Sequence, residues 1–258
     1  MRPSDEEVCF SRIRAIALGM AMYAADYDEV LPFAFGASPV GRWLWNDPHP
    51  VPHDWRPSDE SLYSAFASMW ANSVLPYLDL NRSSKTPTVY DWLRCPSVRA
   101  KRVAGVDYSA ARRRPAYASY TYNGLLHQYP VGLVDNPATV PLVWEGLGRQ
   151  AAFGFARSNP VLRCEFNEQI PCRYTSCSSQ TPLRGVMFIP ESSLWIHPKG
   201  VAFAFVDGHA EWRRLGLVVG GATNPSYDPF TNSNTRGVPS DYWQDSCGYA
   251  LLFRPRTQ

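Results

Sequence analysis

The sequence lacks the short motifs that mark the common classes of enzyme active site. It contains no Gly-x-Ser-x-Gly elbow, no HExxH helix and no phosphate-binding loop. Its carboxylates are dispersed along the chain, and none forms the close pair that glycosidases use. These absences favour a protein that is not an enzyme and that needs no cofactor.

Long apolar runs and a strong net charge are absent as well. No run of roughly 18 apolar residues occurs, so we predict no membrane span in this chain. The first residues, MRPSDEEV, lack the pattern of a signal sequence. For an exported protein, we therefore expect an export segment that has been removed, lies outside this chain or is of an unfamiliar kind.

The formal net charge of +2 gives no overall attraction to nucleic acid, and no nucleic-acid partner is expected. The basic segment 94–115 is interpreted as a solvated loop, with a contact to nucleic acid or to an acidic glycan as the alternative.

The cysteines include no CxxC pair of the kind found in zinc ribbons and thioredoxin-like sites. An even number of cysteines among loop-forming residues favours disulfides in an oxidising compartment, with buried thiols and a metal site as alternatives. We therefore predict an extracellular or cell-surface protein and leave the pairing open at this point. The disulfide candidates are Cys9, Cys95, Cys164, Cys172, Cys177 and Cys247.

One long helix is predicted near the start of the chain. Ser4 and Glu7 form a capping box, S-x-x-E, in which each side chain satisfies a backbone amide at the helix start. Apolar residues then recur at steps of three and four until Pro32 ends the pattern. A single helix cannot bury such a stripe alone, so we expect it to lie against a sheet or a partner.

The middle of the chain has the patterns of short strands. Residues 117–122 (YASYTY) alternate small and aromatic side chains and meet the turn signal Asn123-Gly124. Residues 140–144 and 150–156 are further candidate strands. A short helix is expected near 61–77, interrupted at Pro76.

The clearest hairpin lies in the last third of the chain. It joins 201–206 to 209–212 through Asp207-Gly208, a residue pair favoured in type I′ turns.

The chain then divides into three segments: a helix over 1–32, a β-rich region over 33–219, and a C-terminal tail over 220–258 packed on that region. The β-rich region holds a Cys-rich insert at 158–182, which needs covalent staples because its apolar content is low. Asn81 begins an N-glycosylation sequon by pattern.

Two stretches resemble a family of bacterial pilin-like proteins. Residues 197–209 (HPKGVAFAFVDGH) match the prepilin-type His-x9-Asp-Gly motif, which here consists of His197, Asp207 and Gly208. Residues 9–32 (CFSRIRAIALGMAMYAADYDEVLP) are similar to the segment that follows the hydrophobic helix of these proteins. Shorter matches, LPYL at 75–78, CPS at 95–97 and YTYNG at 120–124, follow in the family's order.

The resemblance implies an α+β, pilin-like fold, in which an N-terminal helix packs on an antiparallel sheet with long disulfide-stapled loops. It implies membership of type II secretion or type IV pilus-like filaments, with other pilin-like subunits as further partners. It also suggests a pairing of Cys9 with Cys95, because both lie in family-like segments.

This chain lacks the apolar segment with which the family begins. Either that segment was trimmed from the chain, or the subunit polymerises through its globular surface. For the second case we expect aromatic contacts at the interfaces between copies, because such side chains contribute large contact areas. Ordinary core packing is the alternative for each individual ring, and the interface candidates are Trp43, Trp45, Trp55, Trp70 and Trp243.

The predicted function is therefore a structural subunit of an extracellular pilus-like or pseudopilus filament that forms a homopolymer without catalysis. The alternatives are a monomeric cell-surface carbohydrate-binding module with a row of exposed aromatic rings, and a secreted hydrolase with a deep polar pocket.

A catalytic or metal site at the motif is not expected. A strand rises about 3.3 Å per residue, so His197 lies too far from Asp207 and His209 to share a site with them. We expect the motif to be structural and His197 to make hydrogen bonds. Asp26, Asp28 and Glu29 could contribute to a Ca²⁺ site, although a solvated surface is the preferred interpretation.

Overall fold

The computed structural model describes residues 3–78, 92–164, 172–177, 185–188, 196–216 and 223–256. The fold is of the α+β class, with one long N-terminal helix, several short helices and mostly antiparallel sheets. Its main hydrophobic core is a connected cluster with members from Cys9 to Phe253, and a small second cluster contains Leu44, Phe66 and Met69. The sequon at Asn81 lies outside the described residues.

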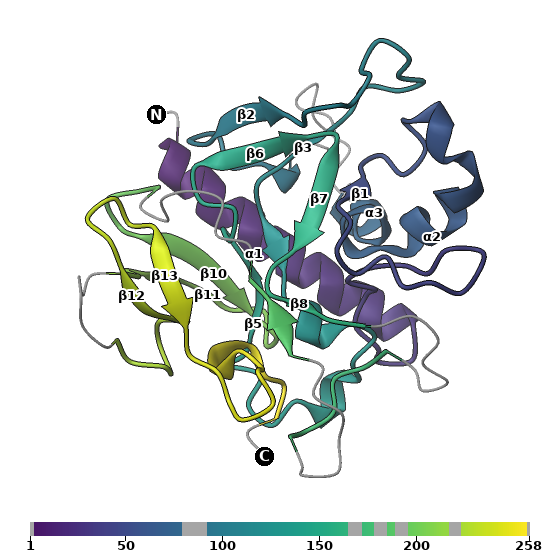
Figure 1. Ribbon diagram of the computed structural model, residues 1–258. Helices are drawn as coiled ribbons and strands as arrows, with labels where there is room; N and C mark the ends of the chain where they lie inside the picture. The colour runs from purple at the N-terminus through teal and green to yellow at the C-terminus, as the bar shows by residue number, and fades with distance from the viewer. Residues whose placement is uncertain are drawn as a thin grey trace.

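Helix α1 (Asp5–Asp26) begins at the predicted capping box. The Ser4 backbone amide donates to the Glu7 carboxylate at 2.7 Å, and the Glu7 amide donates to Ser4 Oγ at 3.3 Å. In Figure 1 the helix crosses the molecule diagonally, and it contacts strands β5, β10 and β11 and helix α4. The expectation that a sheet covers its apolar stripe is therefore confirmed.

The main sheet has six strands in the order β1-β7-β4-β5-β10-β11, and only the β4–β7 pair is parallel. A three-stranded sheet, β2-β6-β3, and two pairs, β8-β9 and β12-β13, complete the β-structure of the described residues. The strands of the main sheet are β1 (His49–Pro50), β4 (Thr121–Tyr122), β5 (Pro141–Trp144), β7 (Phe155–Ser158), β10 (Val201–Phe205) and β11 (Ala210–Arg213). The remaining strands are β2 (Arg99–Arg102), β3 (Tyr117–Ala118), β6 (Gln150–Phe153), β8 (Val161–Leu162), β9 (Val186–Met187), β12 (Phe230–Ser233) and β13 (Pro239–Tyr242).

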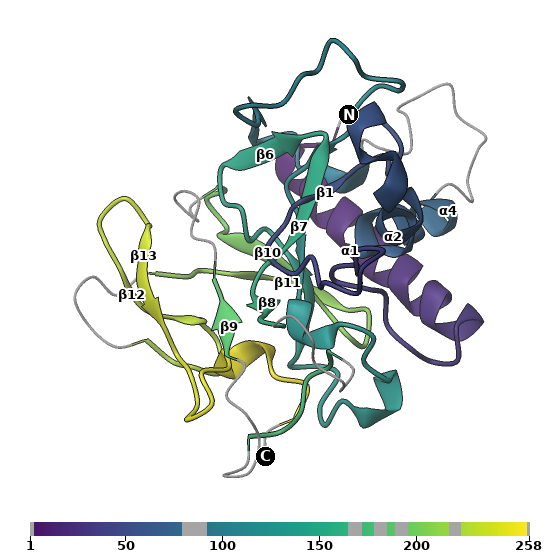
Figure 2. The same cartoon turned by 45° about the vertical axis from the view of Figure 1, so that its right-hand side comes forward.

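The short helices lie on the side of the molecule opposite the β12–β13 pair (Figure 2). They are η1 (Pro57–Leu62), α2 (Tyr63–Ser68), α3 (Trp70–Ser73) and α4 (Leu75–Leu78). The short 3-10 turns η3 (Gly124–Leu126), η4 (Val131–Leu133) and η5 (Leu251–Phe253) occur elsewhere. The predicted break at Pro76 is wrong, because Pro76 stands in the first turn of α4, where its missing amide is tolerated. The chain instead leaves the helical conformation at Met69, with ψ 150°.

Two predicted strands each divide between two sheets. Residues 117–122 become β3 and β4, which belong to different sheets. Residues 150–156 divide into β6 and β7 at Gly154, whose φ of +85° bends the chain. The predicted buried strand at 140–144 is confirmed as β5, which is buried along its whole length.

Among the described residues, α1 is long and apolar enough to cross a membrane by length and composition, with a hydropathy of 1.3 over the best window. The criterion of an unbroken apolar run missed this helix because Arg12 and Arg14 interrupt it. However, 44% of that window is buried within the fold, and the core helix of a folded domain has the same composition. A signal sequence near the N-terminus also shares this composition.

The structure contains three disulfides, which are consistent with an extracellular or secreted protein. Cys9–Cys95 is the pair that the family resemblance suggested. Cys164 pairs with Cys172 inside the predicted insert, and the Cys177–Cys247 bond attaches the C-terminal tail.

Candidate functional site

The His-x9-Asp-Gly motif occupies β10 and both of its ends. Strand β10 lies between β5 and β11, and all five of its residues are buried. His197 precedes the strand and pairs with Gly200 in an isolated bridge, whereas Asp207 and Gly208 form the turn after it. The motif therefore places its histidine and its Asp-Gly pair at opposite ends of one central strand, as its spacing predicted.

The turn differs from the type I′ turn expected from Asp207-Gly208. Such a turn needs a positive φ at two central residues, and here only Gly208 has one, at +86°. The Gly208 amide donates to the Phe205 carbonyl at 2.9 Å, and the Phe205 amide donates to the His209 carbonyl at 2.9 Å. These bonds define a three-residue loop that ends in a left-handed glycine. The Asp207 carboxylate closes it by accepting from the His209 amide at 3.0 Å.

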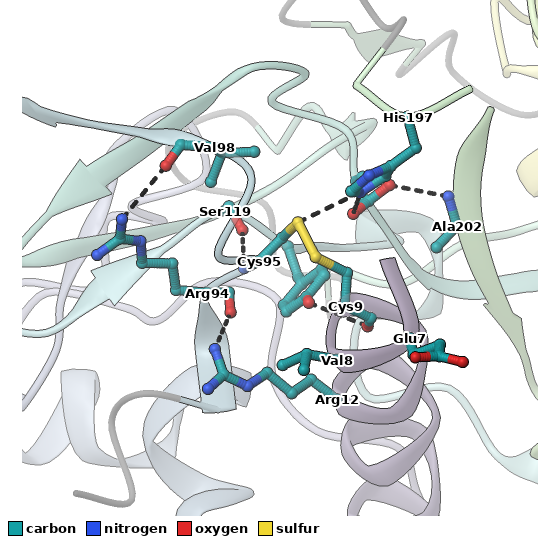
Figure 3. The surroundings of a disulfide bond; sticks show 12 residues. Glu7, Val8, Cys9, Arg12, Arg94, Cys95, Val98, Ser119, His197 and Ala202 are labelled. Carbon is teal, nitrogen blue, oxygen red and sulfur yellow. Dashed lines mark hydrogen bonds and ion pairs between the residues drawn. A yellow bond between two sulfur atoms is a disulfide. The ribbon is translucent and has the colours of Figure 1, made fainter. Parts of the chain in front are cut away.

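At the other end of β10, His197 lies in a buried cluster with Glu145 and the Cys9–Cys95 disulfide (Figure 3). Its Nε2 lies 3.3 Å from Cys95 Sγ and 3.4 Å from Glu145 Oε1. The ring meets Trp212 edge to face, with 5.1 Å between ring centroids. The four candidate ligand atoms of this cluster all lie within 4.8 Å of one another.

The surrounding main chain fixes the position of Glu145. This residue directly follows β5, and its amide donates to the Ala202 carbonyl at 3.2 Å. Its carboxylate Oε2 accepts from the Ala202 amide at 2.9 Å, whereas Oε1 is buried and has no hydrogen-bond partner. Because a buried carboxylate oxygen is costly to leave unsatisfied, Oε1 is the least satisfied atom of the cluster.

The disulfide is held from both sides. The Cys95 amide donates to Ser119 Oγ at 2.8 Å, and the Tyr120 hydroxyl donates to the Cys9 carbonyl at 3.0 Å. Arg12 of α1 donates to the Arg94 carbonyl at 2.5 Å, beside the bond (Figure 3). Both cysteines are fully buried, so the bond ties α1 to the core and lies away from solvent.

A second group with the potential to bind a metal consists of Cys177, Asp245 and Cys247, but its two cysteines are also paired. The proposed Ca²⁺ residues are not brought together in the described part of the chain. Asp26 accepts from the Tyr77 hydroxyl at 2.8 Å, and Asp28 and Glu29 are exposed.

The basic segment is mainly a solvated surface, as expected. Strand β2 is exposed along its length. Arg112 pairs with Glu60 at 3.5 Å, and Arg113 pairs with Asp54 at 3.0 Å, which offsets part of the local charge.

The tryptophan prediction is wrong for two of its members. Trp55 and Trp70 are fully buried, and Trp55 donates to the Gly154 carbonyl at 2.7 Å, so neither ring is available to a partner. Trp43, Trp45 and Trp243 are partly buried. The linear sequence does not separate buried from partly buried tryptophans, because the partners that bury Trp55, such as Gly154, are far away in the chain.

The outer face of α1 was not singled out from the sequence. Its first half carries exposed polar side chains, including Glu7, Ser11 and Arg14. Its second half exposes apolar ones, with Leu18 at 48% and Met22 at 42%. Leu18 also lies beside the Asp207-Gly208 turn, since a Cβ on Gly208 would lie 3.4 Å from Leu18 Cδ2. The turn of the motif is therefore a neighbour of the exposed apolar half of α1.

No family model matches the chain, and no curated protein or solved structure is detectably similar to it.

Proposed function

We propose that the chain is a structural subunit of an extracellular pilus-like or pseudopilus filament, and that it assembles by contacts between copies without catalysis. The resemblance in the His197–Gly208 motif suggests the class of filament. The observation that carries the proposal is the exposed apolar half of α1.

The placement of the motif residues supports a structural role. Asp207 and Gly208 form a turn, and His197 is buried in the cluster of Glu145 and the disulfide. The nearby match at 120–124 is structural as well, because Asn123 donates to the carbonyls of Pro141 and Phe253 at 2.9 and 2.8 Å. Asn123 thus joins β5 to the C-terminal tail, and these hydrogen bonds engage its side-chain amide nitrogen.

The outer face of α1 suits a second copy of the chain. Leu18, Met22 and Tyr27 are exposed at 48%, 42% and 55%, and water contact with such a surface is unfavourable. Arg14 precedes Leu18 by one helical turn, and the exposed Asp28 and Glu29 follow the helix, although Asp5 and Glu7 at its start are acidic as well. A copy displaced along the helix axis would bring Arg14 of one copy toward Asp28 and Glu29 of the next. Such a head-to-tail contact repeats and produces a filament.

The carbohydrate-binding alternative needs several exposed aromatic rings in a row. Among the described residues, the large exposed hydrophobic side chains are Leu18, Met22, Tyr27, Val40, Leu133 and Tyr227, and they include no tryptophan. Two of these residues, Tyr27 and Tyr227, are aromatic, and they lie far apart in the sequence, at the end of α1 and in a turn. We therefore favour the filament.

The test compares wild type with the double variant Leu18→Glu/Met22→Glu. Light scattering after size exclusion and negative-stain microscopy should reveal regular polymers of the wild-type chain that shorten or disappear in the variant. Val40→Glu is the matched control, because Val40 is an exposed apolar residue at 78% that lies outside α1, in the segment between α1 and β1, and it should polymerise like wild type. A wild-type chain that stays monomeric at every concentration, or a double variant that polymerises normally, would refute the proposal.

A further inference from the structure

The side chains of Cys9, Cys95, Glu145 and His197 combine three kinds of zinc ligand in one buried cluster. Two sulfurs, one imidazole nitrogen and one carboxylate oxygen lie within 4.8 Å of one another. Zn²⁺ prefers four such ligands in a tetrahedral arrangement. We propose that the reduced chain binds one Zn²⁺ through these four residues, and that formation of the Cys9–Cys95 disulfide excludes the ion.

The distances to the histidine already suit a tetrahedral site. Zinc lies about 2.3 Å from sulfur and about 2.0–2.1 Å from nitrogen or oxygen, so neighbouring ligand atoms are about 3.3–3.6 Å apart around the ion. His197 Nε2 lies 3.3 Å from Cys95 Sγ and 3.4 Å from Glu145 Oε1. The two sulfurs must also separate, because a disulfide holds them about 2.05 Å apart and zinc would hold them about 3.8 Å apart.

Glu145 supplies an independent sign of a missing ligand. Its Oε1 is buried without a hydrogen-bond partner and points to His197, whereas Oε2 is fixed by the Ala202 amide at 2.9 Å. A zinc ion would satisfy Oε1 and keep the Oε2 bond as the outer support that such ligands usually have. Ser119 Oγ accepts from the Cys95 amide and so fixes the main chain of this ligand residue.

The cluster lies beside a cavity but is itself closed to solvent. His197 borders an open cavity of about 460 Å³, whereas its side chain is only 2% exposed. The disulfide itself is fully buried, so zinc uptake precedes oxidation of the newly made chain or follows reduction by a dithiol. In the reduction, the dithiol gives two electrons and two protons to the S–S bond, becomes a disulfide itself and leaves two protein thiols.

Zinc binding then releases the two thiol protons to water and forms two Zn–S bonds. The reverse step needs a disulfide oxidant, which removes two electrons from the thiolates as Zn²⁺ leaves. With two thiolates and one carboxylate around a divalent cation, the buried site carries one net negative charge. A Cys₃His structural zinc site carries the same charge.

The experiment folds the reduced full-length chain without oxygen, in the presence of Zn²⁺ and a phosphine reductant. We expect the wild type to retain a zinc equivalent that Cys9→Ser/Cys95→Ser loses. Glu145→Gln and His197→Gln should each weaken zinc binding at least tenfold in competition with a chromogenic chelator. Cys177→Ser/Cys247→Ser is the control, because it removes the other potential metal group and should keep the Cys9–Cys95 zinc.

Two further measurements separate a built site from binding by unfolded thiols. Co²⁺ in place of zinc should give the strong visible bands of tetrahedral coordination in wild type, and these should weaken in Glu145→Gln. A disulfide oxidant should release the metal while mass spectrometry detects the Cys9–Cys95 bond. The proposal would be overturned if zinc affinity were unchanged in Glu145→Gln and His197→Gln, or if wild type bound no more zinc than Cys9→Ser/Cys95→Ser. The zinc experiment uses the reduced chain and the polymerisation experiment uses the oxidised chain, so the two proposals can fail separately.

Discussion

Two buried histidines predict a loss of stability on mild acidification. The ring of His127 is fully buried, stacks on Phe35 with 4.0 Å between centroids, and accepts from the Ala34 amide at 3.1 Å through Nδ1. Burial, with a smaller contribution from the charge of Arg173, lowers the pKa of His127 to about 3. Burial alone lowers the pKa of His49 to about 3.

Both rings stay neutral in the folded chain at pH 5, whereas in the unfolded chain a histidine titrates at about 6.5. Between these pKa values the unfolded chain binds more protons, so the unfolding free energy falls as the pH falls below about 6.5. Each histidine contributes about 1.4 kcal/mol per pH unit. At pH 5 the two therefore remove roughly 4 kcal/mol relative to neutral pH, and their contribution is complete above pH 6.5.

The test uses urea unfolding monitored by tryptophan fluorescence, with the disulfides intact, at several values between pH 4.5 and 7.5. His127→Asn keeps an acceptor near the Ala34 amide and removes the titrating ring. The slope of its unfolding free energy against pH below 6 should be shallower than that of wild type by about 1.4 kcal/mol per unit. Val143→Ala, a core variant that keeps both histidines, should be destabilised with an unchanged slope. Parallel curves for wild type and His127→Asn would show that the ring is protonated in the folded state.

Three further predictions concern local structure. Ser4→Ala should lower the unfolding free energy by about 1 kcal/mol in urea titrations, because it removes the capping box of α1. Gly208→Ala should cost about 1–2 kcal/mol for its positive φ, and Gly200→Ala clearly more, because its Cβ would also collide with a backbone carbonyl; equal costs would contradict this reading. Cys177→Ser/Cys247→Ser removes the disulfide that attaches the C-terminal tail. It should lower the unfolding free energy by about 2–4 kcal/mol and expose the tail to limited proteolysis.

The local signals in the sequence predicted the elements whose cause is local. The capping box, strand β5 and the hairpin after β10 depend on residues within a few positions of one another. The turn type was missed because Asp207 remains at negative φ, and its side chain instead accepts the His209 amide. The choice between a two-residue and a three-residue loop depends on the register with β11, which the residue pair alone does not encode.

The divided strands have a non-local cause. The Gly154 carbonyl accepts from the Val51 amide and from the Trp55 indole. Trp55 lies 99 residues away in the sequence, and Val51 lies farther still. A Cβ at this position would lie 2.7 Å from the Trp55 ring, so glycine is needed for the close approach of a distant side chain. A linear pattern records only a small residue there. The same limit explains the tryptophans, since Trp55 is buried by partners that no local window includes.

The cluster around His197 was also inaccessible from the sequence, although each member was visible. Cys95 follows Cys9 by 86 positions, and Glu145 and His197 lie on two further segments. Pairing of β5 with β10 brings Glu145 and His197 together, because Glu145 directly follows β5 and His197 lies shortly before β10. Only the Cys9–Cys95 pair was anticipated, and that came from the family resemblance.

The two ends of the motif therefore have separate roles, and one strand connects them. His197 precedes β10 inside the molecule, against a disulfide that fixes α1, whereas the turn after β10 exposes Asp207 and places the buried Gly208 beside Leu18 of the same helix. Because α1 is held at both ends of β10, loosening the buried cluster should change the position of the exposed helix face. If the filament and zinc proposals are both correct, the reduced, zinc-bound chain and the oxidised chain should differ in polymerisation, since the sulfurs of Cys9 and Cys95 are farther apart around zinc. Equal polymerisation of both forms would show that the outer face of α1 is insulated from the cluster, and it would leave each proposal to its own test.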